Sequence, residues 1–285
     1  MIAIVTDSNS QIPPSLATRL GIEVVPLTVT VDGVAHQEGV DLDADGFYAR
    51  FESGTPSVAT SQPSPGAFAV TYQALADRGA EAIVSVHIGS AISGTLNSAR
   101  LAAADAPVPV RIVDTGTASF GITFAAWAAA DAAAAGRPLD EVVAAAERIG
   151  RGVGNVFVVG VPALARAGGR LAPDPEPDSD RTGDDRPGGI PILTLADGAM
   201  RTVGHAADVD QAARIMADHV LASGTSLRVA VGLADAGTLA LVEAVEALLG
   251  DAPEVRELIR YRVGPSVGAH TGPGTMGAMF HSPPE

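Results

Sequence analysis

The feature that most constrains the fold is an alternation of short apolar runs with helical stretches in the first half of the chain. Runs at residues 2–5, 82–88 and 110–114 have the length and β-branched content of buried strands, and each precedes a polar loop and a helix-like stretch. Strands that alternate with helices in this way form a parallel sheet joined by right-handed crossovers. The pattern therefore predicts a parallel sheet covered by helices on both faces.

The second half of the chain carries further strand patterns separated by helical stretches. These patterns lie at residues 153–161, 190–195, 200–203, 227–233 and 255–263. The Gly-Arg-Pro sequence at residues 136–138 is the best candidate boundary between the halves, because glycine and proline interrupt regular structure. We predict an N-terminal α/β domain at residues 1–138 and a C-terminal α/β domain at residues 139–285.

Composition excludes several classes of function. The 285-residue chain has no cysteine and a net charge of −15, with arginine supplying all 18 basic residues. Disulfides, thiolate metal sites and cysteine nucleophiles are therefore excluded. The acidic balance argues against a nucleic-acid partner, because phosphate binding needs a basic patch. The six histidines lack metal-ligand spacing, so we expect no metal site and no cofactor.

The chain shows no candidate membrane span. Residues 119–135 are the most apolar stretch, but Asp131 interrupts them and alanine dominates, which is typical of a buried helix. Residues 1–7 have a strand pattern and lack the basic region of a signal peptide. We expect a cytoplasmic protein.

The polar loop at residues 90–95 is the first candidate ligand site. Ser93 is expected at the N-cap of the helix that follows, with Gly94 and Thr95 in its first turn. Hydroxyls and backbone N–H groups at the positive end of a helix suit an anion. The alternative is an ordinary capping serine. Asp7, at the end of the first strand, is equally compatible with a ligand site and with a turn.

Two further stretches rich in hydroxyls or glycine strengthen the interpretation as a ligand site. Thr60 and Ser61 fall in a loop predicted at residues 54–65, and His270 and Thr271 begin a glycine-rich stretch near the end of the chain. These side chains donate hydrogen bonds, and such a set suits holding a carboxylate or phosphate rather than transforming it. The alternative is that each stretch merely turns the chain.

The familiar catalytic motifs are missing. Neither Ser90 nor Ser93 lies in the Gly-x-Ser-x-Gly pattern of a serine hydrolase. The chain also has no Walker A loop and no Gly-x-Gly-x-x-Gly fingerprint after its first strand. A binding protein is therefore favoured over an enzyme of these types.

A set of motifs is distributed along the chain: Val-Thr-Asp-Ser at 5–8, Thr-Ser-Gln-Pro-Ser-Pro at 60–65, Ile-Ser-Gly-Thr at 92–95, Val-Asp-Thr at 113–115 with Ser119, Arg-Ala-Gly-Gly-Arg at 166–170, and Gly-Pro-Ser-Val-Gly-Ala-His-Thr-Gly-Pro-Gly at 264–274. Through these motifs the chain resembles the DegV family of bacterial fatty-acid-binding proteins, whose best-understood members are called FakB. These motifs span nearly the whole chain in the order of the family.

The resemblance implies a two-domain α/β protein, with a three-layer N-terminal domain around a parallel sheet and a C-terminal domain with a mixed sheet. It implies that a long-chain fatty acid is the ligand. The implied binding residues are Thr60, Ser61, Ser93, Gly94, Thr95, Arg170, His270 and Thr271. In the FakB branch a separate fatty acid kinase phosphorylates the bound acid, so the protein is expected to be a carrier and not a catalyst.

The chain departs from the family at two places. Residues 172–189 form a Pro/Asp-rich loop, expected to be solvated, where relatives continue with a small apolar helix. Residues 203–208 lack the basic run that relatives carry there, and a kinase partner would read such a run. Two alternatives therefore stay open: an enzyme for a small carboxylated or phosphorylated substrate with His270 as its acid–base or covalent residue, and a member that has lost the acyl tunnel.

Overall fold

The computed structural model describes residues 1–167, 189–196 and 199–283. The chain packs as two compact units. The first contains Met1–Val153 and Tyr261–Ala269, and the second contains Gly154–Arg260 and His270–Glu285. Each unit is described by itself. The predicted Pro/Asp-rich loop at 172–189 lies outside the described residues except for Gly189.

The first unit is built on a four-stranded parallel sheet of order β2-β1-β6-β7. Its strands are β1 (Ile2–Asp7), β2 (Ile22–Val25), β6 (Ala82–His87) and β7 (Val110–Asp114). Strands β1 and β6 are central and nearly continuously apolar, because helices cover both of their faces. The predicted parallel sheet is confirmed.

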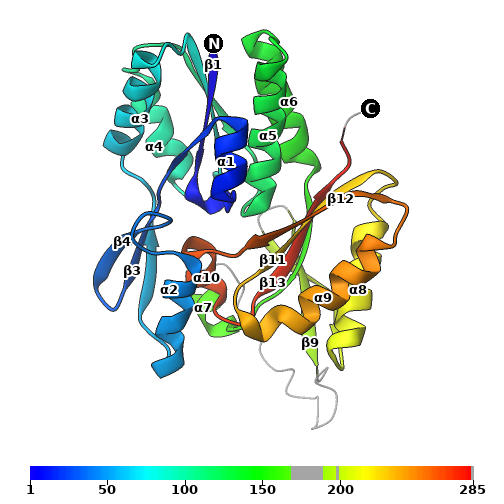
Figure 1. Ribbon diagram of the computed structural model, residues 1–285. Helices are drawn as coiled ribbons and strands as arrows, with labels where there is room; N and C mark the ends of the chain where they lie inside the picture. Colours follow the sequence, from blue (N-terminus) through cyan, green and yellow to red (C-terminus); the bar gives the residue numbers. More distant parts are fainter. Residues whose placement is uncertain (168–188, 197–198, 284–285) are drawn as a thin grey trace. The chain divides into compact units, whose positions relative to one another are not determined.

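Helices form the outer layers of this unit (Figure 1). They are α1 (Pro14–Leu20), α3 (Pro65–Asp77), α4 (Thr95–Ala103), α5 (Phe120–Ala134) and α6 (Leu139–Gly152). Helices α3 and α4 pack through Phe68, Tyr72 and Ala99 against one face of the sheet, and α5 and α6 lie against the other. Helix α5 is the buried helix expected from the apolar stretch. No helix in the described ranges is long and apolar enough to cross a membrane.

A small antiparallel sheet of order β4-β3-β5 also belongs to the first unit. Its strands are β3 (Thr28–Val31), β4 (Val34–Gln37) and β5 (Val58–Ser61), and α2 (Ala44–Tyr48) with the 3₁₀ turn η2 (Ala49–Ser53) lies between β4 and β5. The prediction of one long loop at 54–65 is therefore wrong. The four residues Val-Ala-Thr-Ser are too few to show an alternation that indicates a strand, and pairing with β3 stabilises them as one.

The second unit contains a six-stranded mixed sheet of order β10-β9-β8-β13-β11-β12. The strands are β8 (Gly154–Val158), β9 (Ile190–Ala196), β10 (Ala199–Ala206), β11 (Leu227–Leu233), β12 (Val255–Arg262) and β13 (Met276–His281). Helices α8 (Val209–Leu221) and α9 (Leu239–Gly250), the latter preceded by the 3₁₀ turn η3 (Ala236–Thr238), share its apolar core. The predicted two-part α/β class is confirmed.

Three local differences from the sequence prediction concern the second half of the chain. Strand β13 was not predicted, although it pairs with both β8 and β11 in the middle of the sheet. The predicted basic turn at 164–170 is in part a helix, α7 (Pro162–Ala167). Helix α6, which the predicted boundary at 138 assigns to the C-terminal domain, packs in the first unit, where Gly150 approaches the backbone of Thr115.

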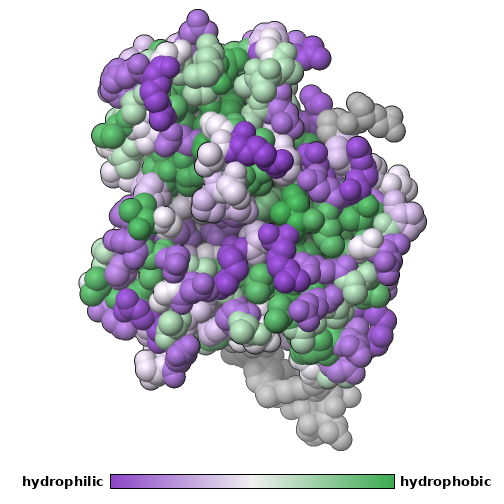
Figure 2. Space-filling model, in the orientation of Figure 1, coloured by the Kyte–Doolittle hydropathy of each residue, from purple (hydrophilic) through white to green (hydrophobic). Residues whose placement is uncertain are grey.

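Large apolar side chains on the surface are scattered. Val40, in the turn after β4, is 75% exposed, and Val70, on α3, is 72% exposed. On the face shown in Figure 2, hydrophobic residues lie among hydrophilic ones. Single exposed apolar residues of this kind are ordinary on soluble proteins.

Candidate functional site

The turn between β6 and α4 holds Ser93, Gly94 and Thr95. The Ser93 hydroxyl lies 3.0 Å from the Thr95 hydroxyl and accepts a 3.3 Å hydrogen bond from the Thr95 N–H. Ser93 is half-buried, Gly94 is exposed and Thr95 is buried. The two hydroxyls therefore lie together at the start of a nine-residue helix, where an anion is favoured.

The expected position of Ser93 in this turn is wrong by one residue. Gly94 is the N-cap of α4, and no side chain caps the helix. The Ser93 hydroxyl instead makes a local turn with the N–H of the residue two positions later. Ser93 therefore stands just outside the helix.

Thr60 and Ser61 end strand β5 and are brought close to this turn. The next residue, Gln62, donates through Nε2 to the Ser98 hydroxyl on α4 at 3.3 Å. The same Gln62 amide lies against Gly94, where a Cβ atom would displace it. Two of the three predicted stretches lie side by side in the first unit.

His270 and Thr271 are the last residues of α10 (Pro265–Thr271) and belong to the second unit. The carbonyl of Thr271 accepts from the Val161 N–H at 2.8 Å and from the Thr275 hydroxyl at 2.9 Å. Gly272 has φ of +74°, and a Cβ there would lie 2.5 Å from Val161 Cγ2. The sharp turn after His270 therefore requires glycine.

The same turn is held by a carboxylate. Asp235 accepts the Gly274 N–H through Oδ2 at 2.6 Å and the Gly237 N–H through Oδ1 at 2.7 Å. Asp235 also begins η3 as its N-cap. This single side chain links the glycine-rich turn to the loop that follows β11.

A buried chain of polar side chains crosses the first unit, and sequence reasoning missed it. Tyr72 on α3 hydrogen-bonds Ser85 at 2.9 Å, Ser85 lies 2.7 Å from His87 Nε2, and His87 Nδ1 lies 2.8 Å from Asp7. All four side chains are fully buried. Burial raises the pKa of Tyr72 to about 12, with the Ser85 hydrogen bond opposing. The signal available was the alternation of Ser85 and His87 on one face of an apolar strand.

Asp7 also shapes the loop after β1. Its second oxygen accepts the Asn9 N–H at 3.0 Å, which caps the 3₁₀ turn η1 (Ser8–Ser10). Of the two interpretations left open for Asp7, the structure shows the capping role, and the side chain is fully buried.

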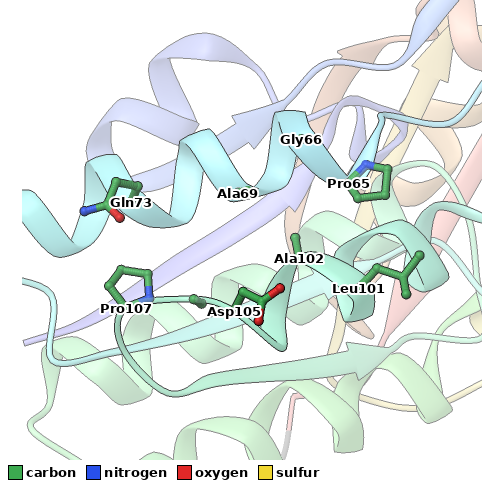
Figure 3. Close-up of a pocket in the computed structure, with 9 residues that line it drawn as sticks. Pro65, Gly66, Ala69, Gln73, Leu101, Ala102, Asp105 and Pro107 are labelled. Atoms are coloured by element: carbon green, nitrogen blue, oxygen red, sulfur yellow. The ribbon is translucent and has the colours of Figure 1, made fainter.

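A shallow cavity of about 280 Å³ lies between α3 and α4. Figure 3 shows it lined by small and apolar side chains, including Pro65, Ala69 and Leu101, with Asp105 and Gln73 at its edge. It contains none of the predicted site residues.

The remaining predicted features are placed as follows. Arg170 lies outside the described residues. The described ranges contain no group of histidine and acidic residues that could hold a metal ion. The association of the Thr60–Ser61 and Ser93–Thr95 stretches with His270, Thr271 and Arg170 in a single site stays a prediction.

Comparison with known proteins identifies the family. The family model described as "uncharacterised protein, DegV family" matches residues 1–173 and 190–282. A DegV domain-containing protein of Streptomyces coelicolor is 35% identical over 285 residues, covering 99% of this chain and 98% of the relative. The chain belongs to the DegV family. The family match omits residues 174–189, which lie within the predicted Pro/Asp-rich loop.

Two solved DegV structures extend the comparison to three dimensions. A fatty-acid-binding DegV family protein from Thermus thermophilus is 30% identical, covers 99% of both chains and superposes with a TM-score of 0.86. DegV of Bacillus subtilis, described as a fatty acid binding protein, is 25% identical with a TM-score of 0.83 and 99% coverage of both chains. The descriptions of these relatives name fatty-acid binding and no enzymatic activity.

Proposed function

We propose that this DegV protein binds a long-chain fatty acid. The observation that carries the proposal is the Thermus thermophilus relative, which matches this chain over 99% of its length and binds fatty acid. The proposed residues around the carboxylate are Thr60, Ser61, Ser93, Gly94, Thr95, His270, Thr271 and Arg170.

The geometry of the first unit supports this assignment. Ser93 and Thr95 present two hydroxyls 3.0 Å apart beside a helix start, and the end of β5 meets them through Gln62. The hydroxyl donors among these residues hold a carboxylate through hydrogen bonds and add no charge of their own, which suits a ligand that must be released. Burial of the acyl chain adds about 0.8 kcal/mol per CH₂ group, so long chains are favoured.

We further propose that the protein is a carrier and that it acts in the cytoplasm. A protein that holds a fatty acid without transforming it presents it to a separate enzyme, and the resemblance to FakB implies that this partner is a fatty acid kinase. The kinase then acts on the carboxylate while the acid stays bound to this protein.

The first test is the content of the purified protein. We expect organic extraction of the denatured protein, followed by mass spectrometry, to release fatty acid in equimolar amount. Folded protein that yields an empty extract, and that takes up no added oleate, contradicts the proposal.

The second test locates the carboxylate. Ser93→Ala removes a hydroxyl from the proposed cradle, and we expect oleate to bind about tenfold more weakly, the cost of one hydrogen bond to a charged group. Ser57→Ala, on an exposed loop of the same unit, is the matched control and leaves affinity unchanged. Equal affinity of Ser93→Ala and wild type would place the carboxylate elsewhere.

A further inference from the structure

A nine-residue segment from near the end of the chain, residues 261–269, completes the first unit. The buried Tyr261 hydroxyl lies 2.9 Å from the Ser119 hydroxyl, and Arg262 pairs with Asp45 at 2.7 Å. The segment then turns into α10, whose last residues are His270 and Thr271.

The first turn of α10 is held by buried side chains from the N-terminal part of the chain. Ser266 donates its backbone N–H to Glu38 Oε1 at 2.8 Å. The Ser266 hydroxyl accepts from Asn9 Nδ2 at 3.1 Å and from Gln11 Nε2 at 3.2 Å. Gln11 Oε1 accepts the N–H of Gly264, the residue before the helix. The Ser266 N–H, which would lack a partner at the start of the helix, is thus bound by the carboxylate of Glu38, a residue distant in sequence.

Glu38 lies at the centre of this hydrogen-bond network at the start of α10. Its side chain is 6% exposed, and the donors that reach it are Ser8, Gln11 and Ser266. The Ser8 hydroxyl already accepts the Leu27 N–H at 2.9 Å, so its own hydrogen goes to Glu38 Oε2 at 2.5 Å. Because every neighbour donates, the position requires an acceptor on both oxygens.

Helix α10 also packs closely against α2. A Cβ atom on Gly268 would lie 2.6 Å from the Tyr48 hydroxyl and 2.7 Å from Phe47 Cε1, so the helix backbone rests directly on α2. A helix of seven residues held at its start and against its side has little freedom to rotate at its end. These bonds and contacts fix the start and one side of the helix that ends in His270 and Thr271.

We propose that Glu38 is a positioning residue for the fatty-acid carboxylate, acting through Ser266 and α10 on His270 and Thr271. This inference rests on the proposed function. Glu38 has no contact with ligand in this proposal, and its effect reaches the carboxylate only through the orientation of the helix.

Two variants of Glu38 test its effect on the affinity for oleate. Glu38→Ala removes the acceptor for Ser266, and we expect oleate to bind about tenfold more weakly. Glu38→Gln keeps one carbonyl oxygen for the Ser266 N–H and loses the acceptor for Ser8, so its loss is about threefold, a partial rescue. Glu141→Ala, an exposed glutamate of the same unit, is the matched control and binds as wild type does.

A second ligand separates positioning from general damage. Oleyl alcohol shares the hydrocarbon chain of oleate and has a hydroxyl in place of the carboxylate. A positioning residue of the carboxylate site changes the affinity for oleate and leaves that for oleyl alcohol within about twofold, whereas a loosened fold lowers both. Circular dichroism identifies any variant that does not fold. If Glu38→Ala does not fold, the ratio of oleate affinity to oleyl alcohol affinity in Glu38→Gln decides the question alone.

The outcomes are distinct for the two proposals. Failure of wild-type protein to bind oleate overturns the proposed function. Wild-type binding together with unchanged affinity in folded Glu38 variants, or with parallel losses of oleate and oleyl alcohol, overturns the positioning role alone.

Discussion

The imidazole of His87 lies between the carboxylate of Asp7, 2.8 Å from Nδ1, and the hydroxyl of Ser85, 2.7 Å from Nε2. The ring also packs edge-on against Phe68, with centroids 5.0 Å apart. Asp7 accepts in addition from the N–H groups of Asn9 and Ile88. Every hydrogen bond of this cluster joins buried groups, so each partner depends on the others.

Removing the acceptor at Asp7 tests this cluster. Asp7→Asn replaces one carboxylate oxygen by an amide nitrogen that faces donors, and we expect the free energy of unfolding to fall by about 2–4 kcal/mol. Urea unfolding followed by circular dichroism measures the loss. Asp77→Asn, whose carboxylate is exposed, is the control and stays within about 0.5 kcal/mol of wild type. A similar small change in Asp7→Asn would mean that the cluster adds no net stability.

Sequence predicts the parallel sheet well because its signal is local. Residues 2–5 are all apolar and residues 82–88 are interrupted only by Ser85 and His87, which is typical of strands covered on both faces. Strands β5 and β13 escape prediction for the opposite reason. Val-Ala-Thr-Ser and the glycine-containing Met-Gly-Ala-Met become strands only because β3, or β8 and β11, lie beside them.

The candidate site could likewise be predicted from the sequence only in part. The turn at Ser93–Thr95 and the stretch at Thr60–Ser61 were predicted from residue type, and the link through Gln62 became evident only in three dimensions. Glu38 and Ser266 are 228 residues apart in sequence, and neither lies in a pattern that predicts the other. Their pairing follows from the return of residues 261–269 to the first unit, which no local signal encodes.

Gly268 tests the close packing of α10. Adding a methyl group there forces the helix away from Phe47 and Tyr48, and we expect Gly268→Ala to lower stability by about 1–3 kcal/mol. Gly66→Ala is the matched control, because the new Cβ meets only the Ser64 hydroxyl at 3.6 Å at the start of α3. Helix propensity makes that substitution neutral or stabilising by up to about 1 kcal/mol. Thermal unfolding of both variants gives the comparison, and equal melting temperatures would contradict the packing argument.

Two buried tyrosines predict an alkaline transition. Burial raises the pKa of both Tyr72 and Tyr261 to about 12, with hydrogen bonds to Ser85 and Ser119 opposing. A raised phenol pKa means that the folded state keeps its proton longer than the unfolded state does. Their contribution to stability is therefore full below pH 10 and is lost as the pH rises through about 12.

Ultraviolet titration of phenolate absorption measures these two groups. We expect Tyr72→Phe and Tyr261→Phe each to remove one high-pH step from the titration curve. Ionisation of all three tyrosines of the chain near pH 10 in folded protein would contradict the buried assignment.

His281, on β13, predicts an acid-dependent loss of stability. Burial lowers its pKa to about 4, against the weaker opposing effect of a backbone hydrogen bond at Ser282. The unfolded state then takes up the proton first, so the stabilisation is full above pH 6.5 and is lost as the pH falls through about 4. The loss amounts to about 3 kcal/mol.

A neutral variant isolates this effect from other acidic groups. We expect the difference in free energy of unfolding between wild type and His281→Gln to depend on pH between 6.5 and 4. Wild type loses stability relative to the variant as the pH falls. Urea unfolding at pH 7.5, 5.5 and 4.5 provides the data. A pH-independent difference would show that His281 titrates alike in both states.

Asp235 tests the turn that follows His270. Its carboxylate holds Gly274 at 2.6 Å while capping η3, so Asp235→Ala frees two N–H groups at once. We expect stability to fall by about 1–2 kcal/mol and oleate to bind severalfold more weakly, because Thr271 loses the support of the turn. Asp208→Ala is the matched control, since Asp208 caps α8 in the same unit but has no bond to the turn. The control loses about 1 kcal/mol of stability and keeps its affinity for oleate. Because both variants remove a helix cap, equal oleate affinity in the two would show that the turn is a structural element without influence on the ligand.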